Sequence, residues 1–313
     1  MNIVPNPLTI NGLLSIPNEQ FVIPSYQRRY AWKEPQVWAL FEDIDMLQDG
    51  DGHLFGMLIL HSSKPHHAGI NQLDLVDGQQ RLTTLSLLLL AILKKYKEEE
   101  NEEKIADINK MLYCKDYNDK TFQKLILGDL DNDDFKRILK NNYAEIQNKN
   151  LLNAFNNFSI WIDKKTEDYG IIWLNKFFYK LVNVAKIIRL DVSHAQDAYK
   201  LFETINNRGL KLSATDIIKN FILGHAAKIS ESKLDEVKTI WSDIIISLDG
   251  LNTDDFFRQY ITGLYQRKIT HTKLVEEFKN YYFKNVDKVE LLGEIDDLLY
   301  HLFVLMNQQG ISL

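Results

Sequence analysis

Apolar residues in the first part of the chain fall into short runs separated by turn-prone polar stretches. The runs at 21–24, 54–60 and 73–76 have the length and composition of strands, and segments rich in glycine, proline and aspartate separate them. Between the first two runs, residues 35–47 carry apolar side chains at three- and four-residue steps, which is the period of one helical face. We therefore expect a helix there, flanked by strands.

The next segment changes from apolar to charged along its length. Residues 82–93 are apolar almost all round, whereas residues 94–104 are mostly charged. This pattern predicts one long helix over residues 82–103 that begins in the core and ends in solvent, so its charges need no partner. The apolar part is too short to cross a bilayer, and we expect no membrane segment.

The rest of the chain is predicted to be mainly helical. Composition becomes polar over residues 112–150, a strand is predicted at 184–192, and helices are predicted at 195–205 and 214–223. From residue 233 onward, apolar residues recur with the helical period and almost no strand signal remains. The predicted class is α+β, with a small mixed sheet and helices followed by a predominantly α-helical region.

Composition limits the classes of function. A formal net charge of −6 argues against non-specific electrostatic binding to nucleic acid, so any DNA contact needs a local basic patch. The single cysteine, Cys114, cannot form an intramolecular disulfide, and the N-terminus lacks the basic-then-apolar pattern of a secretory signal. Both features favour a cytoplasmic location.

The strongest candidate for chemistry is a predicted strand that ends in a glycine turn and leads directly into a helix. Main-chain N–H groups and the helix dipole face an anion placed there, and Gly78 lets the anion approach. Arg81 can hold phosphate oxygens with two bonds, and Asp77 can hold Mg²⁺ or orient a water. Gln79 and Gln80 can position that water. The structural alternative is that Asp77 caps the helix and Arg81 forms a surface salt bridge.

Basic and aromatic side chains alternate just after the first predicted strand. This combination suits contact with a nucleotide or DNA, although the same alternation can place the aromatic rings in a core and the arginines outside it. We expect one arginine to face nucleotide phosphates and the other to lie near DNA. The nucleotide-facing residue is Arg28, and the residues near DNA are Tyr26, Gln27, Arg29 and Lys33.

A third segment has a complete structural interpretation of its own. Residues 206–209 have the composition of a helix C-terminus that closes on a left-handed glycine. Ser213 is then the expected N-cap of the following helix, with Asp216 at its third position.

These three segments, in this order, resemble the GmrSD restriction endonuclease N-terminal domain family, over roughly residues 8–225. The resemblance rests on residues 23–32, on 77–84 and on 202–213 with Asp216, Lys219 and Asn220. It implies a fold similar to ParB and sulfiredoxin, and a nucleotide-dependent defence protein that senses modified DNA. The expected organisation is a nucleotide-binding core at 1–110, a helical connection at 111–182, a strand and helices returning to the core at 183–225, and an all-helical region at 226–313.

The resemblance also implies ligands and partners. We expect an NTP, GTP or ATP, with Mg²⁺ held by Asp77, catalysis by Asp77, Gln79, Gln80 and Arg81, and nucleotide contacts from Gly78, Arg28, Thr84, Asn206 and Arg208. DNA, in a modified form, is the expected partner. No nuclease motif follows residue 225, so nuclease activity is not expected from this chain: either it stops before such a domain or a separate partner supplies one. The oligomeric state stays open.

Several other sites are excluded or left open. No glycine directly precedes a lysine, so a P-loop is absent and any NTPase here is of another class. Glutamine stands where sulfiredoxin needs a cysteine, which excludes sulfinic-acid repair. The aspartates at 129, 131 and 133 fail the EF-hand pattern and predict a solvated acidic loop, and the histidines at 61, 66 and 67 predict a loop rather than a metal site. Two rival functions remain: a ParB-like switch that binds NTP without hydrolysis, and an interaction subunit with a vestigial nucleotide site.

Overall fold

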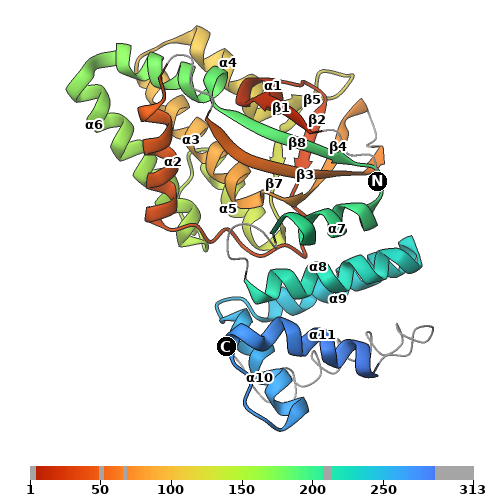
Figure 1. Cartoon of the computed structure of the whole chain (residues 1–313). Coiled ribbons are helices and arrows are strands. Elements are labelled where there is room, and N and C mark those ends of the chain that lie inside the picture. Colours follow the sequence, from red (N-terminus) through yellow and green to blue (C-terminus); the bar gives the residue numbers. More distant parts are fainter. Residues whose placement is uncertain (1–4, 49–52, 66–68, 207–212, 286–313) are drawn as a thin grey trace. The chain divides into compact units, whose positions relative to one another are not determined.

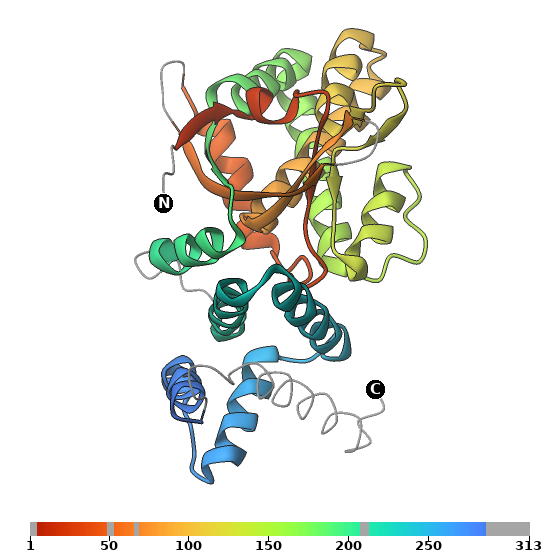
Figure 2. The ribbon, with the colours of Figure 1, turned by 90° about the vertical axis from the view of Figure 1, so that its right-hand side faces the viewer.

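In the computed structural model, the chain folds as two compact units, Met1–Ser193 and His194–Leu313. The structure describes residues 5–48, 53–65, 69–206 and 213–285. The first unit holds a six-stranded mixed sheet with helices, and the described residues of the second unit form helices and connecting turns (Figures 1 and 2). The predicted α+β class, with a helical C-terminal region, is confirmed.

The sheet explains why two of the sequence motifs meet. Its strands are β1 (Asn6–Thr9), β2 (Glu19–Val22), β3 (Leu54–Pro65), β4 (Asn71–Asp77), β7 (Leu125–Ile126) and β8 (Lys186–Val192), in the spatial order β1-β8-β3-β4-β2-β7. Strands β2 and β4 are parallel neighbours, with Val22 beside Asp74. Because parallel strands end at the same edge of a sheet, the segments that follow β2 and β4 leave it side by side.

The core of the first unit lies between the sheet and helices that include α3, α4 and α6. Helix α3 supplies buried side chains on all its faces, as its apolar first half predicts, and it packs against α6 (Figure 1). Gly170 interrupts α6 with a φ of 76°, and a π-helical turn, Lys180–Val184, follows the helix. The helices of this unit are α1 (Ile10–Leu14), α2 (Glu34–Met46), α3 (Gln79–Glu98), α4 (Glu102–Leu112), α5 (Asp129–Leu139) and α6 (Lys149–Tyr179).

The single helix predicted over residues 82–103 is wrong at its C-terminal end. Helix α3 stops at Glu98, Glu100 adopts a left-handed φ of 53°, and α4 begins at Glu102. The Asn101 side chain accepts a hydrogen bond from the Lys104 main-chain N–H at 3.1 Å. Asparagine at an N-cap satisfies an otherwise unpaired N–H of a new helix, which favours a break over continuation.

The solvated acidic loop predicted after residue 128 is also wrong, because this segment begins helix α5. Asp131 and Asp134 are buried. Asp131 accepts hydrogen bonds from Arg29 Nε at 2.8 Å and from the Tyr30 main-chain N–H at 2.6 Å, and Asp134 accepts one from the Asn148 main-chain N–H at 2.7 Å. Carboxylates near a helix N-terminus favour the helix, and here they also fasten it to the segment that follows β2.

The connection expected to be helical, residues 111–182, contains α5 and α6 but also three short strands. Two of them, β5 (Tyr113–Lys115) and β6 (Thr121–Gln123), form a separate antiparallel pair, and the third, β7, extends the main sheet beside β2. The division of the chain at residues 110, 182 and 225 stays a prediction.

The described residues of the second unit form helices joined by turns. None of the helices in the described part of the chain has both the length and the apolar character that crossing a lipid bilayer requires. The described helices of this unit are α7 (Ala195–Asn206), α8 (Ala214–Ile229), α9 (Glu231–Ser247), α10 (Thr253–Tyr265), a short 3₁₀ turn (His271–Lys273) and α11 (Leu274–Asn285).

Candidate functional site

The corner between β4 and α3 leaves the start of a long helix without a side-chain cap. Gly78 occupies the N-cap position with φ 95° and ψ 8°, and no side chain of a described residue caps the first turn. The first intrahelical bond runs from the Leu82 N–H to the Gly78 carbonyl at 3.0 Å. The N–H groups of the three residues between them therefore have no partner within the helix. The structural alternative, in which Asp77 caps this helix, is not what the structure shows.

Only glycine fits position 78, for two reasons. Its positive φ lies in the left-handed region that side chains disfavour. A Cβ atom there would overlap Leu58 Cδ2 and lie 3.0 Å from the Met57 carbonyl oxygen. The turn is thus pressed against β3, which brings the first turn of α3 close to the end of the sheet.

Arg81 folds back toward this corner rather than out into solvent. Its Nη1 donates a hydrogen bond to the Met57 carbonyl oxygen at 2.6 Å, and the side chain is half-buried. Among the residues that the structure describes, no carboxylate pairs with it, so the surface salt bridge of the structural alternative is not formed. A guanidinium carries five N–H donors, and four remain beyond this bond. The corner therefore brings a cationic fork and the main-chain N–H groups of a helix together.

Sequence reasoning missed the contribution of strand β3 to this site. Gly56 lies in that strand with φ 93°, and a Cβ added to it would stand 3.1 Å from Arg81 Cζ. Glycine at this position makes room for the guanidinium against the strand. The signal was present, because an isolated glycine inside a strand pattern often marks a close approach of another group.

Gln80 and Thr84 have their polar atoms committed to the protein itself. Gln80 Oε1 accepts from the Ala31 main-chain N–H at 2.7 Å, and its Nε2 donates to the Arg29 carbonyl at 3.1 Å. Thr84 Oγ1 donates to the Gln80 carbonyl at 2.7 Å and lies 2.8 Å from the Tyr30 hydroxyl. Burial raises the pKa of Tyr30, so its hydroxyl stays protonated and can donate to Thr84. This geometry favours a positioning role for both over contact with a ligand.

Removing the Thr84 hydroxyl tests that assignment. Thr84→Val should lower the free energy of unfolding by about 1–3 kcal/mol, because the buried Tyr30 hydroxyl loses its partner. NTP affinity should change less than twofold. Thr83→Val is the matched control, since Thr83 is buried on the same helix and its hydroxyl forms no hydrogen bond with a described residue. Urea unfolding and NTP titration measure the two effects; a large loss of affinity at unchanged stability would contradict the assignment.

The segment after β2 lies beside the corner, but most of its predicted DNA contacts are engaged inside the protein. Tyr26 and Gln27 are buried, and Gln27 Nε2 donates to the Val76 carbonyl at 3.0 Å. Arg29 is ion-paired with Asp131 at 2.8 Å. For these residues the geometry therefore favours a structural role. Two of the predicted contacts are exposed: Arg28, expected at the nucleotide, and Lys33, expected at DNA.

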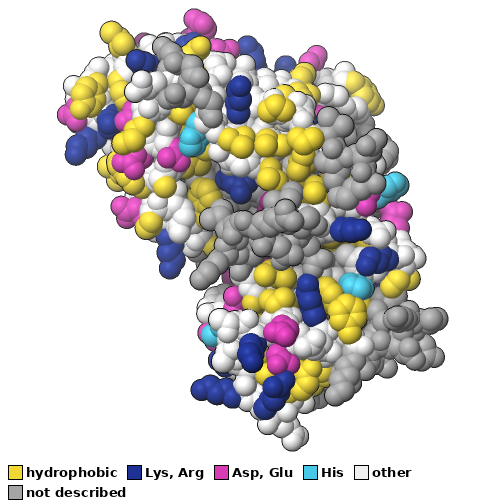
Figure 3. All heavy atoms as spheres, viewed as in Figure 1, with side chains coloured by type: hydrophobic (Ala, Val, Ile, Leu, Met, Phe, Trp, Pro, Cys, Tyr) yellow, Lys and Arg dark blue, Asp and Glu magenta, His cyan; other side chains and the backbone are white. Residues whose placement is uncertain are grey.

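Charge on the visible surface is mixed. On the face drawn in Figure 3, lysine and arginine side chains of the described residues are scattered among acidic and apolar ones. The predicted local basic patch is not evident on that face.

The third motif belongs to the second unit. Helix α7 ends at Asn206, whose side chain is not described, and Arg208 lies outside the described residues, as do His66 and His67. Ser213 caps α8 as predicted, accepting from the Asp216 main-chain N–H at 3.0 Å. A contact of Asn206 and Arg208 with nucleotide stays a prediction.

A metal at the corner would need ligands beyond the protein. Asp77 is half-buried at the end of β4. Within the described residues, no three His, Cys, Asp or Glu side chains gather where they could hold a metal ion. A single carboxylate still fits Mg²⁺ that is bound mainly through substrate phosphates and water, which is the usual arrangement for this ion.

Comparisons with known proteins give three matches: one family model over most of the chain, a second family model over its C-terminal part, and one protein that is similar over a short stretch. The family model described as "GmrSD restriction endonuclease, N-terminal domain" matches residues 10–223. Residues 226–313 match the model of phosphoribosyl-ATP pyrophosphohydrolase. A stretch of 30 residues, 10% of this chain, is 93% identical to the histidine biosynthesis bifunctional protein HisIE of Lactococcus lactis. That stretch spans 14% of the length of the HisIE protein.

Proposed function

The chain belongs to the family of the GmrSD restriction endonuclease N-terminal domain, and we propose that it is the NTP-binding module of a DNA restriction system. The observation that supports the proposal most is the uncapped helix corner at Gly78, with the Arg81 guanidinium, which no described carboxylate neutralises, folded against it. Helix N-termini bind phosphate through main-chain N–H groups and the helix dipole. A guanidinium beside them adds two parallel bonds to the same anion.

The same arrangement supports hydrolysis of the bound NTP. A water attacks the terminal phosphorus, the bond to the bridging oxygen breaks, and NDP and inorganic phosphate leave. Arg81 would offset the charge that develops on the transferred group, and the half-buried Gln79, whose side chain forms no hydrogen bond with a described residue, would orient the water. Mg²⁺ held by Asp77 and the phosphates would neutralise further charge. Gln80 would hold the corner in place rather than meet the substrate.

DNA and a nuclease complete the proposed system. Nucleotide at the corner would act on the segment after β2, because Gln80 is hydrogen-bonded to both Arg29 and Ala31 of that segment. The exposed Arg28 and Lys33 lie on the same segment and are our remaining candidates for phosphate contacts. Binding would thereby couple NTP to DNA contact, and a separate nuclease would perform the cleavage.

A thermal-shift panel tests the binding step. The chain is heated with ATP, GTP, CTP or UTP, each with and without Mg²⁺. A ligand that binds the native state stabilises it by about 2.7 kcal/mol at a concentration one hundred times its Kd, so at least one NTP should raise the melting temperature by several degrees. Absence of a shift with all four NTPs would contradict the proposal and favour a vestigial site.

The products of turnover separate this proposal from a second candidate. The match of residues 226–313 to phosphoribosyl-ATP pyrophosphohydrolase favours cleavage between the first and second phosphates, which releases pyrophosphate and a monophosphate. Hydrolysis at the corner releases orthophosphate and a diphosphate instead. Incubation with each NTP, and with phosphoribosyl-ATP, followed by separate detection of orthophosphate and pyrophosphate, decides between them. Binding without either product would favour a ParB-like switch.

A further inference from the structure

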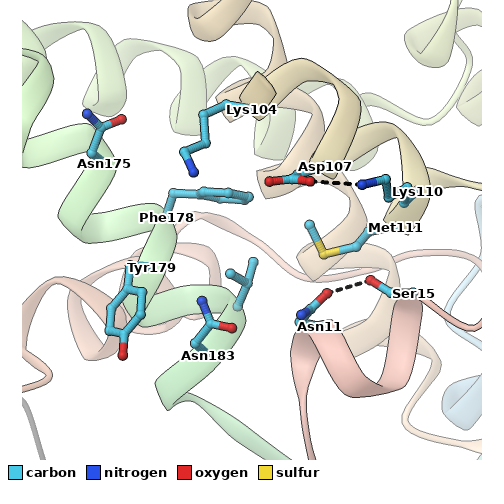
Figure 4. Close-up of a pocket in the computed structure, with 11 residues that line it drawn as sticks. Asn11, Ser15, Lys104, Asp107, Lys110, Met111, Asn175, Phe178, Tyr179 and Asn183 are labelled. Atoms are coloured by element: carbon cyan, nitrogen blue, oxygen red, sulfur yellow. Dashed lines mark hydrogen bonds and ion pairs between the residues drawn. The ribbon is translucent and has the colours of Figure 1, made fainter. Parts of the chain in front are cut away.

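A cavity of about 290 Å³ lies in the first unit, away from the Gly78 corner, between α1, α4 and the end of α6 (Figure 4). Its floor is apolar and consists of three buried side chains, Met111, Phe178 and Val182. Its volume lies just below that of typical small-molecule sites, which range over roughly 300–1,000 Å³. An apolar floor of this kind can pack against a small ring.

Polar side chains line the rim of this cavity, and two of them are held in a fixed orientation. Asn11 Oδ1 accepts from the Ser15 hydroxyl at 2.5 Å, and Asn175 Oδ1 accepts from the Tyr96 hydroxyl at 2.8 Å. Since each carboxamide oxygen is engaged, each Nδ2 is left as a donor. Asn183 adds a third carboxamide from the π-helical turn, a rare geometry that is frequent at functional sites.

Both lysines of the rim are ion-paired, but one of the two pairs is long and its acidic partner is exposed. Lys110 pairs with Asp107 at 3.1 Å, whereas Lys104 approaches an acidic group, Glu103, only at 3.8 Å. The Lys104 side chain is half-buried, and Figure 4 shows its ammonium group directed toward Phe178. Glu103 is 83% exposed and does not line the cavity, so the lining itself carries two lysines and one aspartate, which favours an anionic ligand.

We propose that this cavity is a binding site for a nucleoside monophosphate, distinct from the NTP corner. The base would lie on the floor formed by Met111, Phe178 and Val182. The rim carboxamides would donate to the acceptors on the edge of the base, as asparagine does in nucleic-acid recognition. Lys104 would bind the phosphate. Asp107 would accept hydrogen bonds from ribose hydroxyl groups.

Titration calorimetry on the full chain tests the proposal with AMP, GMP, CMP and UMP, the four nucleosides, and inorganic phosphate. We expect at least one monophosphate to bind with a Kd below about 1 mM, and its nucleoside to bind about tenfold more weakly, because a charged hydrogen bond is lost. If no monophosphate binds at millimolar concentration, or if inorganic phosphate binds as tightly as the nucleotides, the proposal is overturned.

Single substitutions test whether the monophosphate binds in this cavity. Lys104→Met should raise the Kd about tenfold, and Asn183→Ala severalfold. Lys97→Met is the matched control, because it removes the same charge from an exposed position on α3, outside the cavity. Arg81→Ala should leave the affinity of the cavity for the monophosphate unchanged. The proposal of an NTP site at the corner and the proposal of a monophosphate site in the cavity can therefore fail independently. Unchanged affinity in Lys104→Met and Asn183→Ala, with circular dichroism showing both folded, would also overturn the proposal.

Discussion

Arg81→Ala should lower NTP turnover by about a thousandfold, since an arginine that offsets transition-state charge in phosphoryl transfer contributes at least that much to kcat. The physical reason is local: the guanidinium lies against Gly56 and Met57, and no described carboxylate neutralises it. Stability should change little, because the variant removes a single hydrogen bond to a main-chain carbonyl.

The control for this variant is Arg137→Ala. Arg137 lies on α5 and pairs with the exposed Glu145, so its loss removes the same charge away from the corner. Steady-state release of orthophosphate should be unchanged in this control. Arg81→Lys separates charge from geometry: a lysine keeps the charge but cannot form two parallel bonds, so turnover should stay well below that of the unaltered protein. Equal turnover in all three variants and the parent would refute the catalytic role of Arg81.

Asp131→Ala should produce the largest loss of stability, about 3–5 kcal/mol, because it breaks a buried ion pair and leaves the Arg29 charge without its closest partner. Two further groups lose an acceptor, the Tyr30 main-chain N–H and the Asn148 side chain, and the contact between α5 and the segment after β2 is weakened as a result. Urea unfolding followed by circular dichroism measures the change.

Asp133→Ala is the matched control for this second variant. Asp133 lies on the same helix, but its side chain is 86% exposed and, among the described residues, pairs with Lys136 alone. Surface changes of this kind alter stability by about 0.5 kcal/mol or less. Similar losses in the two variants would show that α5 is not fastened through Asp131.

Local patterns in the sequence were sufficient for the corner and for most elements of the fold. The strand-glycine-helix junction at Gly78 was predictable, because a left-handed turn and a helix start depend on neighbouring residues only. The same holds for the Ser213 cap, where a side chain meets an N–H three residues later. The Gly78 junction and the Ser213 cap both depend on residues that are close together in sequence.

Contacts between distant residues were not predictable from one sequence. Arg189 on β8 forms two bonds with Glu19 on β2, at 2.7 and 3.0 Å, across 170 positions of sequence. Asp131 resembled a solvated acid because its partner Arg29 lies 102 positions away. A pattern search shows which residues are charged, but which charges meet in the folded chain depends on strand order.

The basic and aromatic segment after β2 was also hard to interpret from composition alone, because composition does not show which side chains are buried. Its composition favoured nucleic-acid contact, yet Tyr26 is buried and Arg29 forms an ion pair with Asp131 inside the protein. Basic and aromatic residues serve a core and a binding surface equally well, and only their burial separates the two uses.

The most direct test of the account is a crystal structure of the chain with Mg²⁺ and a non-hydrolysable NTP analogue. We predict that a phosphate group lies within hydrogen-bond distance of the main-chain N–H groups that follow Gly78, and that the Arg81 guanidinium contacts the same phosphate. Analogue bound elsewhere, with Arg81 still directed only at the Met57 carbonyl, would contradict the account.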